Sequence, residues 1–128
     1  MPASRRMQLA EEFLAAAEAD REAGRPNAAA SAAIHATIYA CDAVCLHLVG
    51  ERSKGPSHGE ALRLLQRACR GTKQEAEVGA RVRQLSQILA LKPDAEYGGR
   101  GIAGDGARRV VERTRRFVGW ASSVVRGT

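Results

Sequence analysis

The sequence predicts an all-α fold, an up-and-down bundle of four to five helices that forms a single domain over residues 1–128. Hydrophobic residues make up 45% and charged residues 27% of the chain, which is typical of a globular protein. Aromatic residues make up only 4% while alanine is abundant, and this composition suits closely packed helices better than a sheet. Apolar residues also recur at helical spacing in long segments separated by glycine and proline turns. A chain of 128 residues is long enough for one core and short for two.

The first two predicted helices follow each other over residues 4–49. Ser4 is the expected N-cap of a helix that reaches Ala23, where Gly24 ends it. Pro26 suits the first position of a second helix that reaches Val49, the longest and most apolar segment, which we expect to be central. The inward-facing residues of the first helix are expected to be Leu9, Phe13, Ala16 and Ala17. Those of the second are expected to be Ile34, Ile38, Cys41, Cys45 and Leu48.

Two capping signatures predict the third and fourth helices. Ser57 and Glu60 have the spacing of a capping box, which predicts a helix over about residues 57–69. Thr72 and Glu75 repeat the spacing and open a fourth helix, which Pro93 is expected to end. The apolar positions of this helix are Val78, Val82, Leu85 and Leu89.

A glycine-rich segment, "YGGRGIAGDG" over residues 97–106, precedes the last helix. It holds too many glycines for a helix or a central strand, and it has neither the preceding strand of a dinucleotide-binding loop nor the Gly-Lys-Ser/Thr of a P-loop. We expect a linker, with an anion-binding loop as the alternative. The last helix is predicted over about Asp105–Val125. Its core face comprises Val110, Val111, Thr114, Phe117, Val118, Ala121, Val124 and Val125.

The composition also bears on location and on metal binding. No apolar run approaches the roughly 20 residues needed to cross a bilayer, and the N-terminal segment is acidic where a signal peptide is apolar, so we expect a cytoplasmic protein without membrane contact. Three cysteines, an odd number, indicate small core residues in a reducing compartment. Because Cys41, Cys45, His47 and Cys69 have no recognised ligand spacing, the sequence predicts no metal site and no cofactor.

The formal net charge of +6 is unevenly distributed along the chain. Residues 100–128 carry seven arginines against Asp105 and Glu112. Such a basic face attracts phosphate-bearing partners. No aromatic residues are interleaved with the arginines as stacking platforms, so a solvated surface is the favoured interpretation and a nucleic-acid surface the alternative.

A polar stripe crosses the second helix. His35, Tyr39 and Asp42 follow the spacing i, i+4 and i+7, which places all three on one helix face. The favoured interpretation is that His35 and Tyr39 lie at the core boundary while Asp42 bonds a neighbouring helix or loop end. The alternative is a functional pocket.

Two further polar pairs lie near this stripe in the predicted fold. Arg52 precedes His58 by six residues; such a guanidinium can hold a phosphate while the imidazole moves a proton from a ribose 2′-hydroxyl. Local packing of His58 in the first helical turn is the alternative. Lys92 and Tyr97 lie where the fourth helix meets the glycine-rich segment. We expect Asp42, His58 and Tyr97 to form one polar cluster, which requires the loop after the second helix to fold back roughly 12 Å along it.

Together, residues 27–65, the "LKPDAEY" element over residues 91–97 and the C-terminal helix resemble HEPN-type domains, particularly small actinobacterial members, over about residues 8–125. The resemblance implies a helical bundle, commonly dimeric. The family includes metal-independent ribonucleases, nucleotide-binding partners of nucleotidyltransferases in toxin–antitoxin pairs, and members with no known activity. The Arg…His motif of the ribonuclease members usually lies near the later helices, whereas Arg52 and His58 lie between the second and third. Lys92 stands where related sequences often have arginine, which keeps the charge but loses the bidentate fork.

The leading hypothesis is nucleotide or RNA-phosphate binding without established catalysis, by the candidate residues Asp42, Arg52, His58, Lys92 and Tyr97. One alternative is a protein-interaction or dimerisation module with no ligand. A second is a metal-independent ribonuclease using Arg52 and His58. The expected partners are a second copy of the chain, a nucleotide or RNA, and a toxin–antitoxin partner protein.

Overall fold

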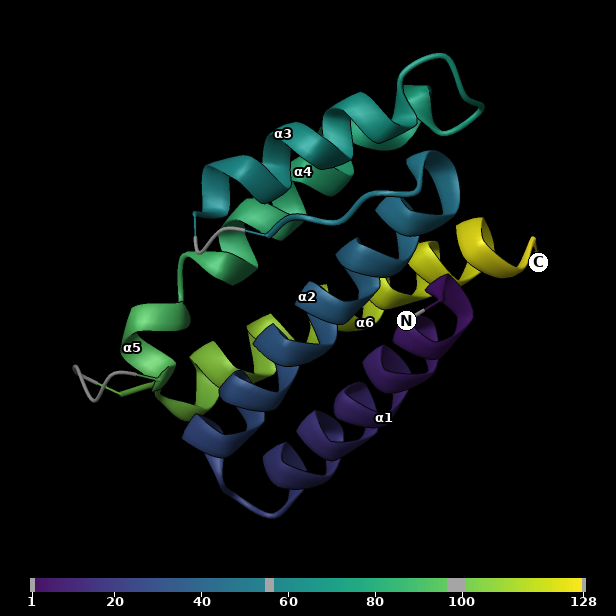
Figure 1. Cartoon of the computed structure of the whole chain (residues 1–128). Helices are drawn as coiled ribbons and strands as arrows, with labels where there is room; N and C mark the ends of the chain where they lie inside the picture. The colour runs from purple at the N-terminus through teal and green to yellow at the C-terminus, as the bar shows by residue number, and fades with distance from the viewer. Residues whose placement is uncertain (1, 55–56, 97–100, 128) are drawn as a thin grey trace.

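The computed structural model describes residues 2–54, 57–96 and 101–127, and these residues form six helices and no strand (Figure 1). The helices are α1 (Ala3–Glu22), α2 (Pro26–Val49), α3 (His58–Cys69), α4 (Glu75–Leu89), α5 (Lys92–Glu96) and α6 (Gly104–Arg126). The predicted all-α class is confirmed. The five-residue helix α5 was not predicted.

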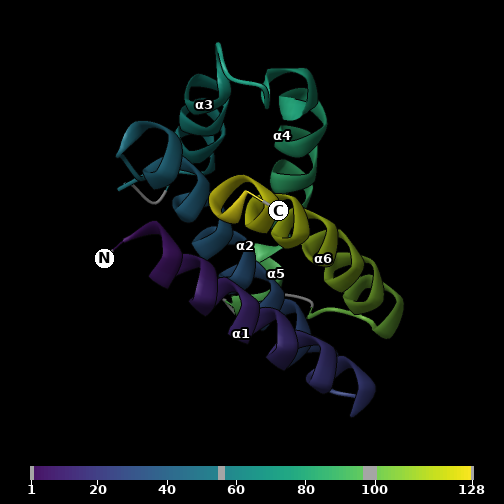
Figure 2. The same ribbon diagram turned by 90° about the vertical axis from the view of Figure 1, so that its right-hand side faces the viewer.

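Helix α2 is the centre of the bundle, as predicted. It packs against every other helix, with α1 and α6 along its length and the α3–α4 hairpin over another face (Figures 1 and 2). Half of its twelve buried positions are alanine, which lets neighbouring helices approach closely. The buried alanines of α2 are Ala29, Ala30, Ala33, Ala36, Ala40 and Ala43.

The same helix qualifies as a membrane span by length and composition. Among the described residues, α2 alone passes this test, with a mean hydropathy of 1.5 over its most apolar stretch, so the expectation that no segment approaches such a length is wrong. The core helix of a globular protein passes the same test, and 56% of that stretch is buried inside the bundle.

The inward faces of the helices follow the prediction closely in α6 and less so in α1. All the predicted core residues of α6 are buried except Val125, which is half-buried. In α1 the buried residues are Met7, Ala10 and Ala17, whereas the predicted Ala16 is exposed. Alanine is small enough for either face of a helix, so the alanines of α1 do not define its inward side.

The predicted caps of α1 and α3 do not form. Ser4 lies inside α1, whose N-cap is Pro2, and Ser57 precedes α3 without a side-chain capping hydrogen bond. The N-cap of α4 is Gln74, which makes no side-chain capping hydrogen bond, so the predicted capping box does not form there either. Thr72 and Glu75 instead accept from backbone N–H groups of the turn that precedes the helix. The Thr72 hydroxyl accepts from the N–H of Gln74 (3.1 Å). The Glu75 carboxylate accepts from the N–H of Gly71 (2.8 Å).

We predicted that Pro93 ends the fourth helix, and this is wrong, because Pro93 lies inside α5. Helix α4 already ends at Leu89, and α5 begins at Lys92. Proline fits the first turn of a helix because its missing N–H would have no helical partner there. Helix α5, which begins with Lys92, contacts α2.

Candidate functional site

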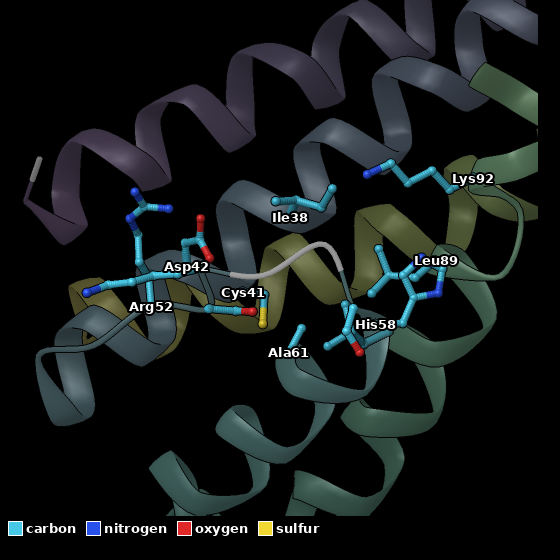
Figure 3. Close-up of a pocket in the computed structure, with 12 residues that line it drawn as sticks. Ile38, Cys41, Asp42, Arg52, His58, Ala61, Leu89 and Lys92 are labelled. Carbon is cyan, nitrogen blue, oxygen red and sulfur yellow. The ribbon is translucent and has the colours of Figure 1, made fainter. Parts of the chain in front are cut away.

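A cavity of about 240 Å³ lies between α2, the segment that follows it, α3, α4 and the start of α5 (Figure 3). We call it the α2–α3 cavity. Its polar lining comprises Asp42, Arg52, Ser53, Lys54, Ser57, His58 and Lys92. Its apolar lining comprises Ile38, Cys41, Ala61, Leu85 and Leu89.

The end of α2 creates this cavity by reversing the chain. Gly50 caps the helix in the left-handed conformation, with φ of 71°, which glycine adopts without steric cost. The following segment then runs back along α2 towards the start of α3 (Figure 1). Arg52 consequently lies near Asp42, although Asp42 is two turns before the end of the helix. This is the fold-back that a cluster around Asp42 requires.

Four of the five predicted site residues, Asp42, Arg52, His58 and Lys92, line this one cavity. Tyr97 lies outside the described residues. Figure 3 shows Asp42 and Arg52 on one side of the cavity and His58 and Lys92 on the other, so Arg52 and His58 do not adjoin. The structure thus brings four candidates together, and their role in ligand binding stays a prediction.

Asp42 is held by an arginine of α1. Arg6 Nη1 donates to Asp42 Oδ2 at 3.0 Å, and the two side chains are only 13% and 9% exposed. The interpretation that Asp42 bonds a neighbouring helix is therefore confirmed. Burial raises the pKa of Asp42, while the positive charges of Arg6 and Arg52 lower it. The carboxylate belongs both to the α1–α2 interface and to the cavity wall.

The other two residues of the polar stripe do not line the cavity. The rings of His35 and Tyr39 stack on Phe13 of α1, with centroid distances of 5.5 and 5.6 Å. Nδ1 of His35 also lies 2.8 Å from the carbonyl oxygen of Ser31, and the Arg6 guanidinium lies 5.8 Å from the centre of the Tyr39 ring. These two residues form part of the α1–α2 interface, as the core-boundary interpretation predicted.

The cavity carries a net positive charge. Arg52, Lys54 and Lys92 all line it, and none forms an ion pair within residues 2–54, 57–96 and 101–127. Asp42, the one carboxylate among the described lining residues, is already paired with Arg6. The described lining therefore carries three positive charges, from Arg52, Lys54 and Lys92, against the single carboxylate of Asp42.

Sequence reasoning missed Lys54 and Arg6. Lys54 follows Arg52 by two residues, and in an extended segment that spacing directs both side chains to the same side. This signal was available. Arg6 offered none, because its partner is 36 residues away and the chain holds many other arginines.

Among the described lining residues, the Cys41 thiol is not an activated nucleophile. Hydrogen bonding with Cys45 and burial raise the pKa of the Cys41 thiol, so this residue stays protonated and poorly reactive. No group of three or more His, Cys, Asp or Glu side chains in the described part of the chain is arranged to hold a metal ion. The described lining of the cavity combines cationic and polar side chains with an apolar floor.

The HEPN domain family matches residues 3–124, which include α1 to α5 and nearly all of α6. The chain belongs to the HEPN domain family. HEPN domains are linked to RNA binding and cleavage. No curated protein gives a match to the chain.

In this HEPN domain a second hollow, of about 510 Å³, adjoins the cavity and shares Arg52, Ser53 and Lys54 with it. Its far wall carries Arg67, whose guanidinium donates two hydrogen bonds to Glu51, at 3.0 and 3.2 Å.

Proposed function

We propose that this HEPN domain binds the phosphate of a nucleotide or of RNA in the α2–α3 cavity. The observation that carries the proposal is the convergence of Arg52, Lys54 and Lys92, together with His58, on a cavity whose described carboxylate is paired with Arg6. Unpaired cations around a partly enclosed pocket favour an anionic ligand, and an arginine matches the shape of a phosphate.

The apolar floor of the cavity fits the rest of a nucleotide. Ile38 offers carbon surface between the two charged sides (Figure 3), and Leu85 and Leu89 also line the cavity. A sugar or base can pack against such surface while the phosphate contacts the cations. The volume of about 240 Å³ lies below the roughly 300–1,000 Å³ of most small-molecule pockets, so one nucleotide unit is the expected content.

The proposal is binding rather than cleavage. A general base and a phosphate-binding group must reach the same scissile bond. Figure 3 places Arg52 and His58 on opposite sides of the cavity, and this separation disfavours them as a ribonuclease pair.

Binding of a fluorescently labelled single-stranded oligouridylate, measured over a range of salt concentrations, tests the proposal. Replacing Arg52 and Lys92 together with glutamine is expected to weaken binding at least tenfold, since each charge-assisted hydrogen bond contributes about 1.5–3 kcal/mol. The slope of log K against log salt should fall by about 0.7, because the contact with one phosphate of a single strand is lost.

Matched variants separate a site from a general charge effect. Arg109→Gln and Arg116→Gln remove two exposed charges from α6, away from the cavity, and the pair should leave affinity within about twofold. Equal losses in the two double variants would contradict a localised site. His58→Ala should weaken binding without lowering the melting temperature; a lower melting temperature with unchanged binding would instead make His58 a structural anchor for the loop.

Dimerisation, a toxin–antitoxin partner and a cytoplasmic location stay predictions. The dimer was expected because five apolar helix faces could exceed one core. Among the described residues, however, Val49 is the only large hydrophobic side chain that is exposed, at 36%.

A further inference from the structure

One oxygen of Asp42 is not used by the protein. Oδ2 accepts from Arg6, whereas Oδ1 has no hydrogen-bond donor among the residues that the structure describes. The side chain is 9% exposed, and the residue lines the α2–α3 cavity. A carboxylate oxygen can only accept hydrogen bonds. Oδ1 is thus an open acceptor position at the cavity wall.

We propose that Asp42 accepts a hydrogen bond from the ribose 2′-hydroxyl of the bound nucleotide, and so makes the cavity selective for ribonucleotides over deoxyribonucleotides. This inference rests on the proposed function, since it requires a nucleotide in the cavity. It assigns Asp42 as a specificity-determining residue rather than a phosphate contact.

The neighbour of Asp42 favours a hydroxyl next to a phosphate. The positive charge of Arg52 acts on Asp42, and Figure 3 shows the two side chains on the same side of the cavity. In RNA the 2′-hydroxyl is attached to the carbon next to the one that bears the 3′-phosphate. A carboxylate beside a guanidinium therefore matches this pair of groups, with the hydroxyl on Asp42 and the phosphate on Arg52.

The rest of the lining indicates where the base lies. Ile38 and Cys41 lie between the Asp42 side and the Lys92 side of the cavity (Figure 3). A flat base packs on such carbon and sulfur surface. Its N–H groups then lie away from the phosphate, whereas the 2′-hydroxyl stays close to it. The ribose is consequently the donor that the geometry favours for Asp42.

Arg6 positions the carboxylate for this contact. It donates to Oδ2 from α1 and is itself only 13% exposed, so Oδ1 is the oxygen that remains to accept from a ligand. Replacing Asp42 with asparagine tests the assignment sharply. Arg6 would donate to the amide oxygen, and the amide NH₂, which cannot accept, would take the place of Oδ1.

The experiment compares three labelled oligouridylates of equal length that carry a 2′-hydroxyl, a 2′-hydrogen or a 2′-fluorine. The fluorinated strand keeps the sugar conformation of RNA but lacks the hydroxyl donor. The unmodified HEPN domain is expected to bind the ribose strand roughly tenfold more tightly than either analogue, because each analogue leaves the Asp42 oxygen unpaired. In Asp42→Asn the three affinities should agree within about twofold.

Arg6→Gln is the matched control, because it breaks the same ion pair but keeps the Asp42 carboxylate. It should retain most of the ribose preference. Equal loss of preference in both variants would assign it to the ion pair and overturn a direct contact by Asp42. Melting curves followed by circular dichroism establish that both variants are folded. If Asp42→Asn does not fold, Asp42→Ser takes its place, and the fluorinated strand still shows with the unmodified protein whether the 2′-hydroxyl itself is recognised.

The remaining outcomes each have one meaning. Equal binding of ribose and deoxyribose strands overturns the inference and leaves the proposed function intact. Tight binding of the fluorinated strand assigns the preference to sugar conformation and also overturns it. Failure to bind any of the three strands at low salt defeats the proposed function itself.

Discussion

Removing the Arg6–Asp42 ion pair is expected to lower the free energy of unfolding. Replacing Arg6 with methionine keeps most of the aliphatic packing and leaves Asp42 buried without its partner. Breaking a buried pair in this way costs about 3–5 kcal/mol. Because the side chains are 13% and 9% exposed rather than fully enclosed, we expect a loss of about 3 kcal/mol at pH 7. In a domain of this size the melting temperature should fall by roughly 10 °C.

Lowering the pH should reduce this loss. Burial raises the pKa of Asp42 and Arg6 lowers it, so removing Arg6 raises the pKa of Asp42 further above its unfolded value. A raised folded-state pKa means that the folded protein binds the proton more tightly than the unfolded chain. The resulting stabilisation is present below the unfolded pKa and is lost as the pH rises through the folded one. The deficit of Arg6→Met relative to the unmodified protein should therefore shrink as the pH falls below 7.

Urea unfolding followed by circular dichroism, at pH 7 and at stepwise lower pH, measures both effects. The control is Arg115→Met, which removes the pair with Glu18 at 3.2 Å, where the side chains are 48% and 39% exposed. Such a surface pair contributes less than about 1 kcal/mol. If Arg6→Met and Arg115→Met cost the same at pH 7, or if the Arg6→Met deficit does not change with pH, the account of Asp42 as a buried and paired carboxylate is refuted.

Two further predictions concern the core and the oligomer. Phe117 is fully buried in α6, and Phe117→Ala should lower the free energy of unfolding by about 3–5 kcal/mol in urea titrations; a loss below about 1 kcal/mol would contradict the packing of α6 against α2. We also expect a homodimer, to be measured by light scattering at micromolar concentration, and a monomer mass would contradict it.

Most of the fold was predictable because its long helices carry their own signals. The periodicity of α6 identified seven buried positions correctly, and Gly24 and Gly50 marked the ends of α1 and α2. The features that were predicted wrongly or not at all are short and local. Serine caps depend on a side-chain rotamer that competes with solvent, and a five-residue helix such as α5 has too few positions to show a period.

The candidate site was predictable only as far as the helix order allowed. Asp42, Arg52, His58 and Lys92 could be placed near one another once an antiparallel arrangement and a folded-back loop were assumed. The partner of Asp42, Arg6, could not be predicted. The two residues are 36 positions apart in the sequence, and their contact depends on how α1 is rotated about its axis against α2. The alanine-rich surface of α1 leaves that rotation undetermined by sequence pattern alone.

The central place of α2 also has a consequence for how the chain is made. Its main partners are α1, which precedes it, and α6, which begins only at Gly104. At about 5–20 residues per second, the ribosome needs roughly 4–15 s to travel from the end of α2 to the end of α6. During that time one face of the most apolar helix lacks its cover. The nascent chain therefore passes through a period in which it is vulnerable to aggregation, and chaperone capture of α2 would shorten that exposure.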